Sequence, residues 1–129
     1  MQAEVYTAEV RGTQAADTVE DLYVSIPAIL GGDWNLREVN KVPFDAATFS
    51  ATNYATLTVY GQDGTTSLGT ISVDAVSDVA GTKRTVTLTE SVQRKFNAGD
   101  VMKLAITMPG TGLAQDAMYQ VTWEKMREP

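Results

Sequence analysis

The segment from Thr52 to Thr65 constrains the fold more than any other part of the chain, because an alternating strand pattern runs directly into a turn signal. Leu57 and Val59 lie on one face of the predicted strand, and its other face carries Thr56, Thr58 and Tyr60. Asp63-Gly64 then supplies the positive-φ position of a hairpin turn. One apolar and one polar face are typical of an antiparallel sheet that is buried on one side.

The same alternation recurs along the chain and predicts that short strands build most of the molecule. It occurs at residues 4–11, 22–26, 34–39, 67–74, 85–89, 101–108 and 118–126. With the strand before the hairpin, this gives about eight strands, the number that a jelly roll needs. We therefore expect an all-β protein, a single-domain β-sandwich of jelly-roll type with about eight antiparallel strands.

The chain is long enough for one hydrophobic core but lacks the side chains that most often carry catalysis. Its 129 residues fit one domain, with apolar residues spread over the whole length. It contains neither cysteine nor histidine, so disulfides, thiolate nucleophiles and the commonest metal ligands are absent. We therefore expect a protein that is not an enzyme and that needs no cofactor or metal.

Charge and hydropathy also restrict the expected partners. The formal net charge of -6 opposes binding to the phosphate backbone of nucleic acids, which depends on Lys and Arg. No apolar run approaches the roughly 18 to 20 residues of a membrane span. Residues 1–4 lack the basic and apolar regions of a signal peptide. We expect no nucleic-acid partner, no membrane partner and no export by the standard route.

Five short segments follow one another in an order and spacing similar to those of a known group of proteins. They are Ser25-Ile26-Pro27-Ala28, Val42-Pro43-Phe44-Asp45, the hairpin from Thr52 to Thr65, Ala98-Gly99-Asp100-Val101 and Gly110-Thr111-Gly112-Leu113-Ala114. In these segments the chain resembles capsid decoration (cement) proteins of tailed bacteriophages, small virion proteins with a jelly-roll fold. The resemblance covers residues 22 to 126, and its motifs are turn and strand signatures rather than chemical ones.

The resemblance implies a structural role on the exterior of a capsid, in a virion assembled from proteins made in the host cytoplasm. It implies two partners, the major capsid protein and further copies of this chain in a homotrimer. Residues 1–21 would then be an N-terminal strand or a capsid-contacting arm, and residues 22–129 the jelly-roll domain. The candidate interface residues are Val5, Tyr6, Val10, Trp34 and Tyr54.

The two tryptophans are expected to differ in exposure. Trp123 shares its strand face with Tyr119 and Val121, which predicts a place in the core. Trp34 opens a strand directly after the Gly31-Gly32 turn, and we expect it to be at least partly accessible or to lie in an interface.

Two other functions and one ion site remain open as alternatives. The same sandwich would suit a head-fibre base or a tail structural component. It would also suit a carbohydrate-binding module whose exposed aromatic rings stack on sugars, although glycan binding is the less favoured interpretation. The acidic residues Asp17, Glu20 and Asp21 match no calcium-loop spacing, so a solvated loop is favoured over a cation site.

Overall fold

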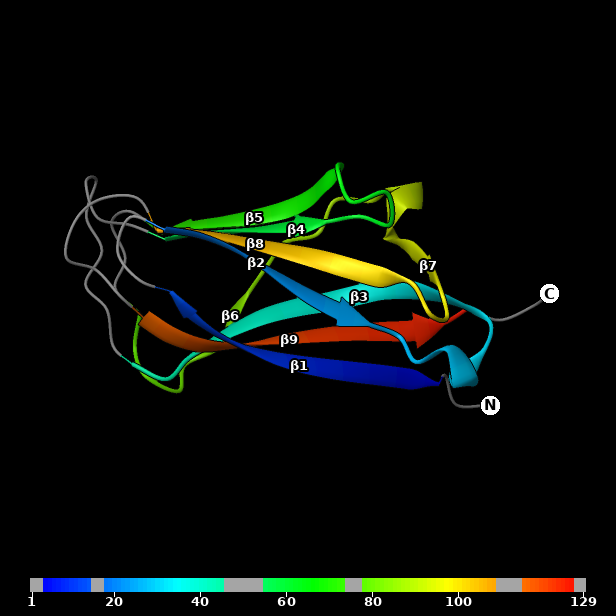
Figure 1. Cartoon of the computed structure of the whole chain (residues 1–129), viewed down its shortest axis with the longest axis horizontal. Helices are drawn as coiled ribbons and strands as arrows, with labels where there is room; N and C mark the ends of the chain where they lie inside the picture. Colours follow the sequence, from blue (N-terminus) through cyan, green and yellow to red (C-terminus); the bar gives the residue numbers. More distant parts are fainter. Residues whose placement is uncertain (1–3, 15–17, 46–54, 74–77, 109–114, 127–129) are drawn as a thin grey trace.

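The computed structural model describes residues 4–14, 18–45, 55–73, 78–108 and 115–126, and in these ranges nine strands form two antiparallel sheets (Figure 1). The strands are β1 (Val5–Gln14), β2 (Thr18–Ser25), β3 (Asp33–Pro43), β4 (Ala55–Tyr60), β5 (Ser67–Val73), β6 (Arg84–Thr85), β7 (Lys95–Asn97), β8 (Val101–Met108) and β9 (Gln115–Lys125). Two single 3-10 turns, η1 (Ala28–Leu30) and η2 (Val92–Arg94), complete the described elements. Within these ranges no helix is long and apolar enough to span a membrane.

The order of the strands is that of a jelly roll. One sheet has the order β1-β9-β3-β6, with β7 also paired to β3, and the other has the order β2-β8-β4-β5. The pairs are nested, because the first strand pairs with the last, the second with the last but one, and the fourth with the fifth. This is an antiparallel ribbon rolled over two layers. The predicted fold class is confirmed.

The expected strand at residues 85–89 is much shorter in the structure. Only Arg84–Thr85 pairs with β3, and the chain then leaves the sheet. It returns to β3 as β7, where Phe96 lies opposite Trp34. The strand count therefore rises to nine in the described ranges, because two short strands share the edge of β3.

The core lies between the sheets and follows the alternation of the sequence. On β9, Ala117, Tyr119, Val121 and Trp123 face inward and are fully buried. Met102, Leu104 and Ile106 of β8 and Leu57 and Val59 of β4 face them from the other sheet. The prediction that Trp123 belongs to the core is confirmed. Its ring stacks on Tyr6 at a centroid distance of 6.0 Å and meets the edge of Phe96 at 6.1 Å.

The predicted hairpin at Asp63-Gly64 joins β4 to β5. Gly64 takes the positive φ of 75°, and the Asp63 carboxylate accepts hydrogen bonds from the hydroxyl and N–H of Thr66 and from the N–H of Thr65. The Thr66 hydroxyl, followed by the two backbone N–H groups, lowers the pKa of Asp63 to about 2. The charged aspartate therefore holds the turn closed through local hydrogen bonds.

The first described strand, β1, is part of the sandwich. β1 pairs with β9 along its whole length, from Val5 opposite Glu124 to Gln14 opposite Gln115. Tyr6, Ala8 and Val10 turn inward and pack against the core. Residues 5–14 thus contribute one edge of a sheet.

Trp123 tests whether the aromatic layer stabilises the fold. Replacing Trp123 with Ala should lower the free energy of unfolding by about 3–5 kcal/mol, because it removes a fully buried aromatic ring and leaves a cavity. Replacing the exposed Val92 with Ala should change it by no more than about 0.5 kcal/mol. Chemical denaturation of both variants measures the difference, and an unchanged midpoint for the Trp123 variant would contradict the assignment.

Candidate interaction surfaces

One lateral side of the sandwich is closed by a segment that crosses between the sheets. After β6, residues 86–93 leave the edge of β3 and run along the edge of β5. The Val86 N–H donates to the Val39 carbonyl at 2.9 Å, and the Thr89 N–H donates to the Leu68 carbonyl at 2.7 Å. These bonds satisfy backbone groups on the edges of both sheets, so this side is protected from further strand pairing.

The opposite lateral side is open. Here β1 and β2 are the outer strands of their sheets, and the two strands contact each other across the corner of the sandwich (Figure 1). In the part of the chain that the structure describes, neither strand has a partner on its outer edge. Such an edge offers a row of N–H and C=O groups to another chain. We call the surface formed by β1 and β2 the open side.

Three exposed apolar side chains lie on the two strands of the open side, on the outer faces of different sheets. Val19 is 70% exposed and Tyr23 is 59% exposed on β2, and Val5 is exposed on β1. Tyr23 lies opposite Lys103 of β8, whose Nζ is 4.5 Å from the ring centroid of Tyr60 on β4. The outer face next to the open side therefore presents two aromatic rings around one lysine, a surface suited to contact with another protein.

The predicted interface residues do not share one environment. Val5 lies on the outer face of β1, whereas Tyr6 and Val10 point inward and are partly buried against the core. Trp34 is buried, and Tyr54 lies outside the described residues. Of the four that are described, only Val5 is exposed on the open side.

The expectation that Trp34 is accessible is wrong, because its side chain is only 2% exposed. The glycines before it take φ values of 59° and 80° and turn the chain so that Trp34 enters β3 on the inner face. Its indole N–H donates to the Gly31 carbonyl at 2.9 Å, and the Lys125 ammonium lies 5.9 Å from its ring centroid. A turn at the start of a strand therefore did not leave the ring in solvent.

The sequence interpretation missed Val19 and Tyr23. The strand expected at residues 22–26 begins earlier, at Thr18, so Val19 belongs to a strand rather than to the preceding polar loop. Within β2, Leu22 and Val24 are buried while Tyr23 points outward. Extending the period of two toward the N-terminus from Leu22 would have placed Val19 and Tyr23 on one exposed face.

The acidic residues Glu20 and Asp21 do not converge on one point. They are consecutive in β2, so their side chains leave the strand on opposite faces. Asp17, the third residue considered, lies outside the described ranges. Among the described residues, no group of three or more acidic side chains could hold a metal ion.

A buried polar cluster joins β3, β9 and the segment before β6 at one end of the sandwich. The Lys41 ammonium lies 2.9 Å from the Asp78 carboxylate, which also accepts hydrogen bonds from the Arg84 guanidinium and, at 3.0 Å, from the Gln115 side-chain amide. Burial alone would raise the pKa of Asp78, but the bonds from Gln115 and Lys41 outweigh it, and the pKa lies below its ordinary value. Burial lowers the pKa of Lys41, and Asp78 offsets part of that effect. Asp78 thereby ties the segment before β6 to β3 and β9.

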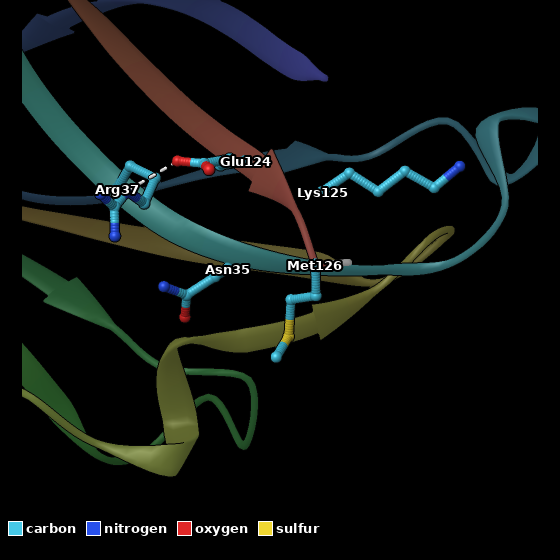
Figure 2. Close-up of a pocket in the computed structure, with 5 residues that line it drawn as sticks. All are labelled: Asn35, Arg37, Glu124, Lys125 and Met126. Atoms are coloured by element: carbon cyan, nitrogen blue, oxygen red, sulfur yellow. Dashed lines mark ion pairs between the residues drawn. The ribbon is translucent and has the colours of Figure 1, made fainter. Parts of the chain in front are cut away.

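A shallow pocket of about 300 Å³ lies on the outer face where β3 begins and β9 ends (Figure 2). It is lined by Asn35, Arg37, Glu124, Lys125 and Met126. Arg37 and Glu124 pair across it at 3.1 Å, and both side chains remain partly in solvent. Lys125 pairs with Glu4 at 3.4 Å. Since the charges that line the pocket are paired and hydrated, it could hold a small polar group only weakly.

No protein-family model matches the chain, and no curated protein matches it. Its fold is similar to that of a protein from Bacillus endospore appendages, described as disulfide-linked pili, with 17% identity and a TM-score of 0.45 over 99% of this chain and 93% of that chain. It is also similar to VP2 of infectious bursal disease virus in a subviral particle, with 15% identity and a TM-score of 0.47 over 96% of this chain and 33% of that chain. The structure of the Gx strain of that virus has 19% identity and a TM-score of 0.42, over 95% of this chain and 32% of that chain. At these identities and TM-scores, the likeness assigns no function to this chain.

Asp78 gives the buried cluster a measurable pH dependence. Replacing Asp78 with Asn should lower the free energy of unfolding at pH 7 by about 3–5 kcal/mol, because buried Lys41 loses its counter-charge. The folded-state pKa lies below the ordinary value of 3.8, so this contribution is present above about pH 4 and is lost as the pH falls through the folded-state pKa.

Denaturation of the two proteins from pH 7 down to pH 2 measures this difference. The matched control is Glu124→Gln, which breaks the exposed pair with Arg37 and should cost no more than about 1 kcal/mol. A deficit for Asp78→Asn that stays constant down to pH 2 would contradict the assignment of the charge to folding stability.

Proposed function

We propose that this chain is a structural virion protein of a tailed bacteriophage, a decoration or cement protein that binds the outside of the head and stabilises the shell. The observation that carries the proposal is the open side, where two strand edges and the exposed Val5, Val19 and Tyr23 have no cover within the described chain. Unpaired strand edges beside exposed apolar side chains can pair with another chain. The similarity of five turn and strand segments to cement proteins supports the same role.

The proposed mechanism is burial of surface rather than chemistry. Copies of the chain join through the open side into a homotrimer, and the trimer binds several subunits of the major capsid protein at once. Several modest contacts held in one trimer act together through effective concentration. Because the trimer binds only the assembled shell, it stabilises that shell by mass action. In this mechanism the chain is not an enzyme and needs neither cofactor nor metal.

The charge of the chain favours the outer surface of the head. Its net charge of -6 would be repelled by packaged nucleic acid on the inside of a capsid. On the outer face of β1 and β9, the positive charge of Arg11 does not offset this net negative charge locally, because Arg11 is paired with Asp116 at 2.9 Å. The proposed location is therefore the virion exterior, with synthesis in the host cytoplasm.

Carbohydrate binding is the second candidate, and one observation favours it. The rings of Tyr23 and Tyr60 flank Lys103 on a sheet face, and aromatic rings with a nearby donor can stack on and bind a sugar. Lys103 already covers the ring of Tyr60, which leaves Tyr23 as the accessible platform. Glycan binding without capsid binding would favour this candidate over the cement role, and a position only in the tail would favour a tail component.

The open side predicts the oligomeric state. In solution the protein should have three times the 13.9 kDa mass of one chain, measured by light scattering coupled to size exclusion. Replacing Val19 with Asp should lower the mass toward that of the monomer, because a charge is then buried at the contact between copies. Val92→Asp is the matched control, since Val92 is 85% exposed but lies on the closed side. A wild-type monomer at high micromolar concentration would contradict the trimer.

The cement role predicts a gain in the heat resistance of capsids. Shells assembled without this chain should disrupt at a lower temperature than complete virions, and adding the purified protein should restore the higher temperature. A chelator should not prevent the recovery, because no metal takes part in the proposed contact. Recovery is measured as the fraction of intact particles after heating, and a particle reconstruction shows where the chain binds. No binding to such shells would remove the cement assignment.

A further inference from the structure

We infer that the η1 turn is a rigid apolar plug, and that Ile29 at its tip inserts into an apolar pocket of the capsid subunit below the trimer. The inference rests on the proposed function, because it names the contact through which the cement protein would bind the shell. The η1 tip is defined here as Ala28, Ile29 and Leu30, the three residues between Pro27 and Gly31.

The exposure of Ile29 is the first observation. Its side chain is 93% exposed, the highest value among the large apolar residues described, and Leu30 beside it is also exposed. All three residues of the tip are exposed, so none contributes to the core of this chain. Removing the apolar surface of Ile29 from water would lower the free energy. The tip is therefore suited to a partner that covers it.

The rigidity of the turn is the second observation. The Leu30 N–H donates to the Pro27 carbonyl and the Gly31 N–H donates to the Ala28 carbonyl, each at 3.1 Å. From the core side, the buried Trp34 indole donates to the Gly31 carbonyl at 2.9 Å. These bonds hold the turn in one conformation, so little conformational entropy is lost when Ile29 is bound. Preorganisation is expected of a binding element and is not needed in a connecting loop.

The connection behind the tip is also anchored. The Gly99 N–H donates to the Ile26 carbonyl at 2.7 Å, which ties the end of β2 to the segment before β8. Gly31 and Gly32 have φ values of 59° and 80°, which return the chain to β3 directly after the tip. In Figure 1 the η1 turn lies at the end of the sandwich where β1 begins and β9 ends. The tip thus projects from one end of the molecule.

The charges around the tip argue against a membrane surface as the occupant. Lys95 and Lys125, the lysines on the strands next to Trp34, are paired with Asp33 and Glu4, each at 3.4 Å. An interfacial membrane contact with one or two apolar residues needs several cations for anionic lipid, and the chain carries a net charge of -6. A protein pocket needs no such cations. A capsid subunit is therefore the occupant that the surroundings favour.

The size of the tip argues for a repeated surface rather than a contact between two copies. A stable interface buries roughly 800 Å² on each partner, far more than the three apolar residues of the tip can supply. One tip alone would bind weakly. Three tips on a trimer, each in an equivalent pocket of neighbouring subunits, bind together with an effective concentration that replaces single-site strength. A capsid shell presents such equivalent pockets.

The test compares two exposed apolar residues at opposite ends of β3. Ile29→Asp places a charge on the tip. The control, Val79→Asp, changes a valine that is 61% exposed in the turn whose Gly81 N–H donates to the Pro43 carbonyl. Both proteins are added to shells assembled without this chain, and binding is measured by co-sedimentation. The Ile29 variant should bind at least about tenfold more weakly per tip, because a buried isoleucine is replaced by a charge. The control should bind like the wild type.

Each other outcome overturns the inference in a distinguishable way. Equal binding by the Ile29 variant would show that the tip does not contact the shell, while leaving the cement role intact. A loss of the trimer mass in that variant would assign the tip to the contact between copies. Wild-type binding to anionic vesicles that the Ile29 variant loses would assign it to lipid. A wild type that does not bind shells would remove the cement role itself.

The variant Ile29→Met, which keeps an apolar tip, should bind shells like the wild type without changing the melting temperature.

Discussion

The structure depends on the pairing of the first strand with the last. β1 and β9 are paired at ten positions. At one of these pairs, the inward-facing rings of Tyr6 and Trp123 stack on each other. Trp123 also lies opposite Leu36 of β3 and touches Phe96 of β7, so one indole ring connects four strands. Since these strands come from the two ends and the middle of the chain, the aromatic layer forms only when the whole ribbon has rolled up.

This rolled ribbon also explains why the two lateral sides differ. The chain between β6 and β7 has to pass from one sheet toward the other and back, and on its way it bonds to the Val39 and Leu68 carbonyls. Nothing comparable crosses the side of β1 and β2 in the described ranges. The fold therefore closes one side with its own backbone and, in the described ranges, leaves the outer edges of β1 and β2 unpaired on the other. The exposed Val19 and Tyr23 lie on β2, one of the two strands of the open side.

In the described ranges, the interior contains an ionic cluster around Asp78 that the apolar pattern does not predict. A bulge between Leu36 and Glu38 shifts the alternation of β3 by one residue, so Lys41 faces inward, opposite Tyr119. It is tolerated because Asp78, far along the chain, arrives with its carboxylate 2.9 Å away. A buried lysine without that partner would be costly, so the placement of the segment before β6 and the burial of Lys41 depend on each other.

Local patterns in the sequence were enough to predict much of the fold and little of the surface. The alternation of Leu57 with Val59 and of Tyr119 with Trp123 identified inward faces, because a strand has a fixed period of two. The turn at Asp63-Gly64 was equally readable, since its hydrogen bonds join residues that are neighbours in sequence. The short β6 and β7 were not predicted correctly, because their pairing depends on which edge of β3 is free.

What the sequence by itself determined was the class of the protein: an all-β sandwich with a net charge of -6 and no cysteine or histidine. What only the tertiary structure decided was the exposure of residues on either side of the Gly31-Gly32 turn. Trp34 and Ile29 flank the same pair of glycines, yet one is 2% and the other 93% exposed. Alternation states which side of a strand a residue takes, but not whether another strand covers that position. For Trp34 the cover comes from Phe96 and Lys125, which are distant in sequence, and for Ile29 the described chain supplies none.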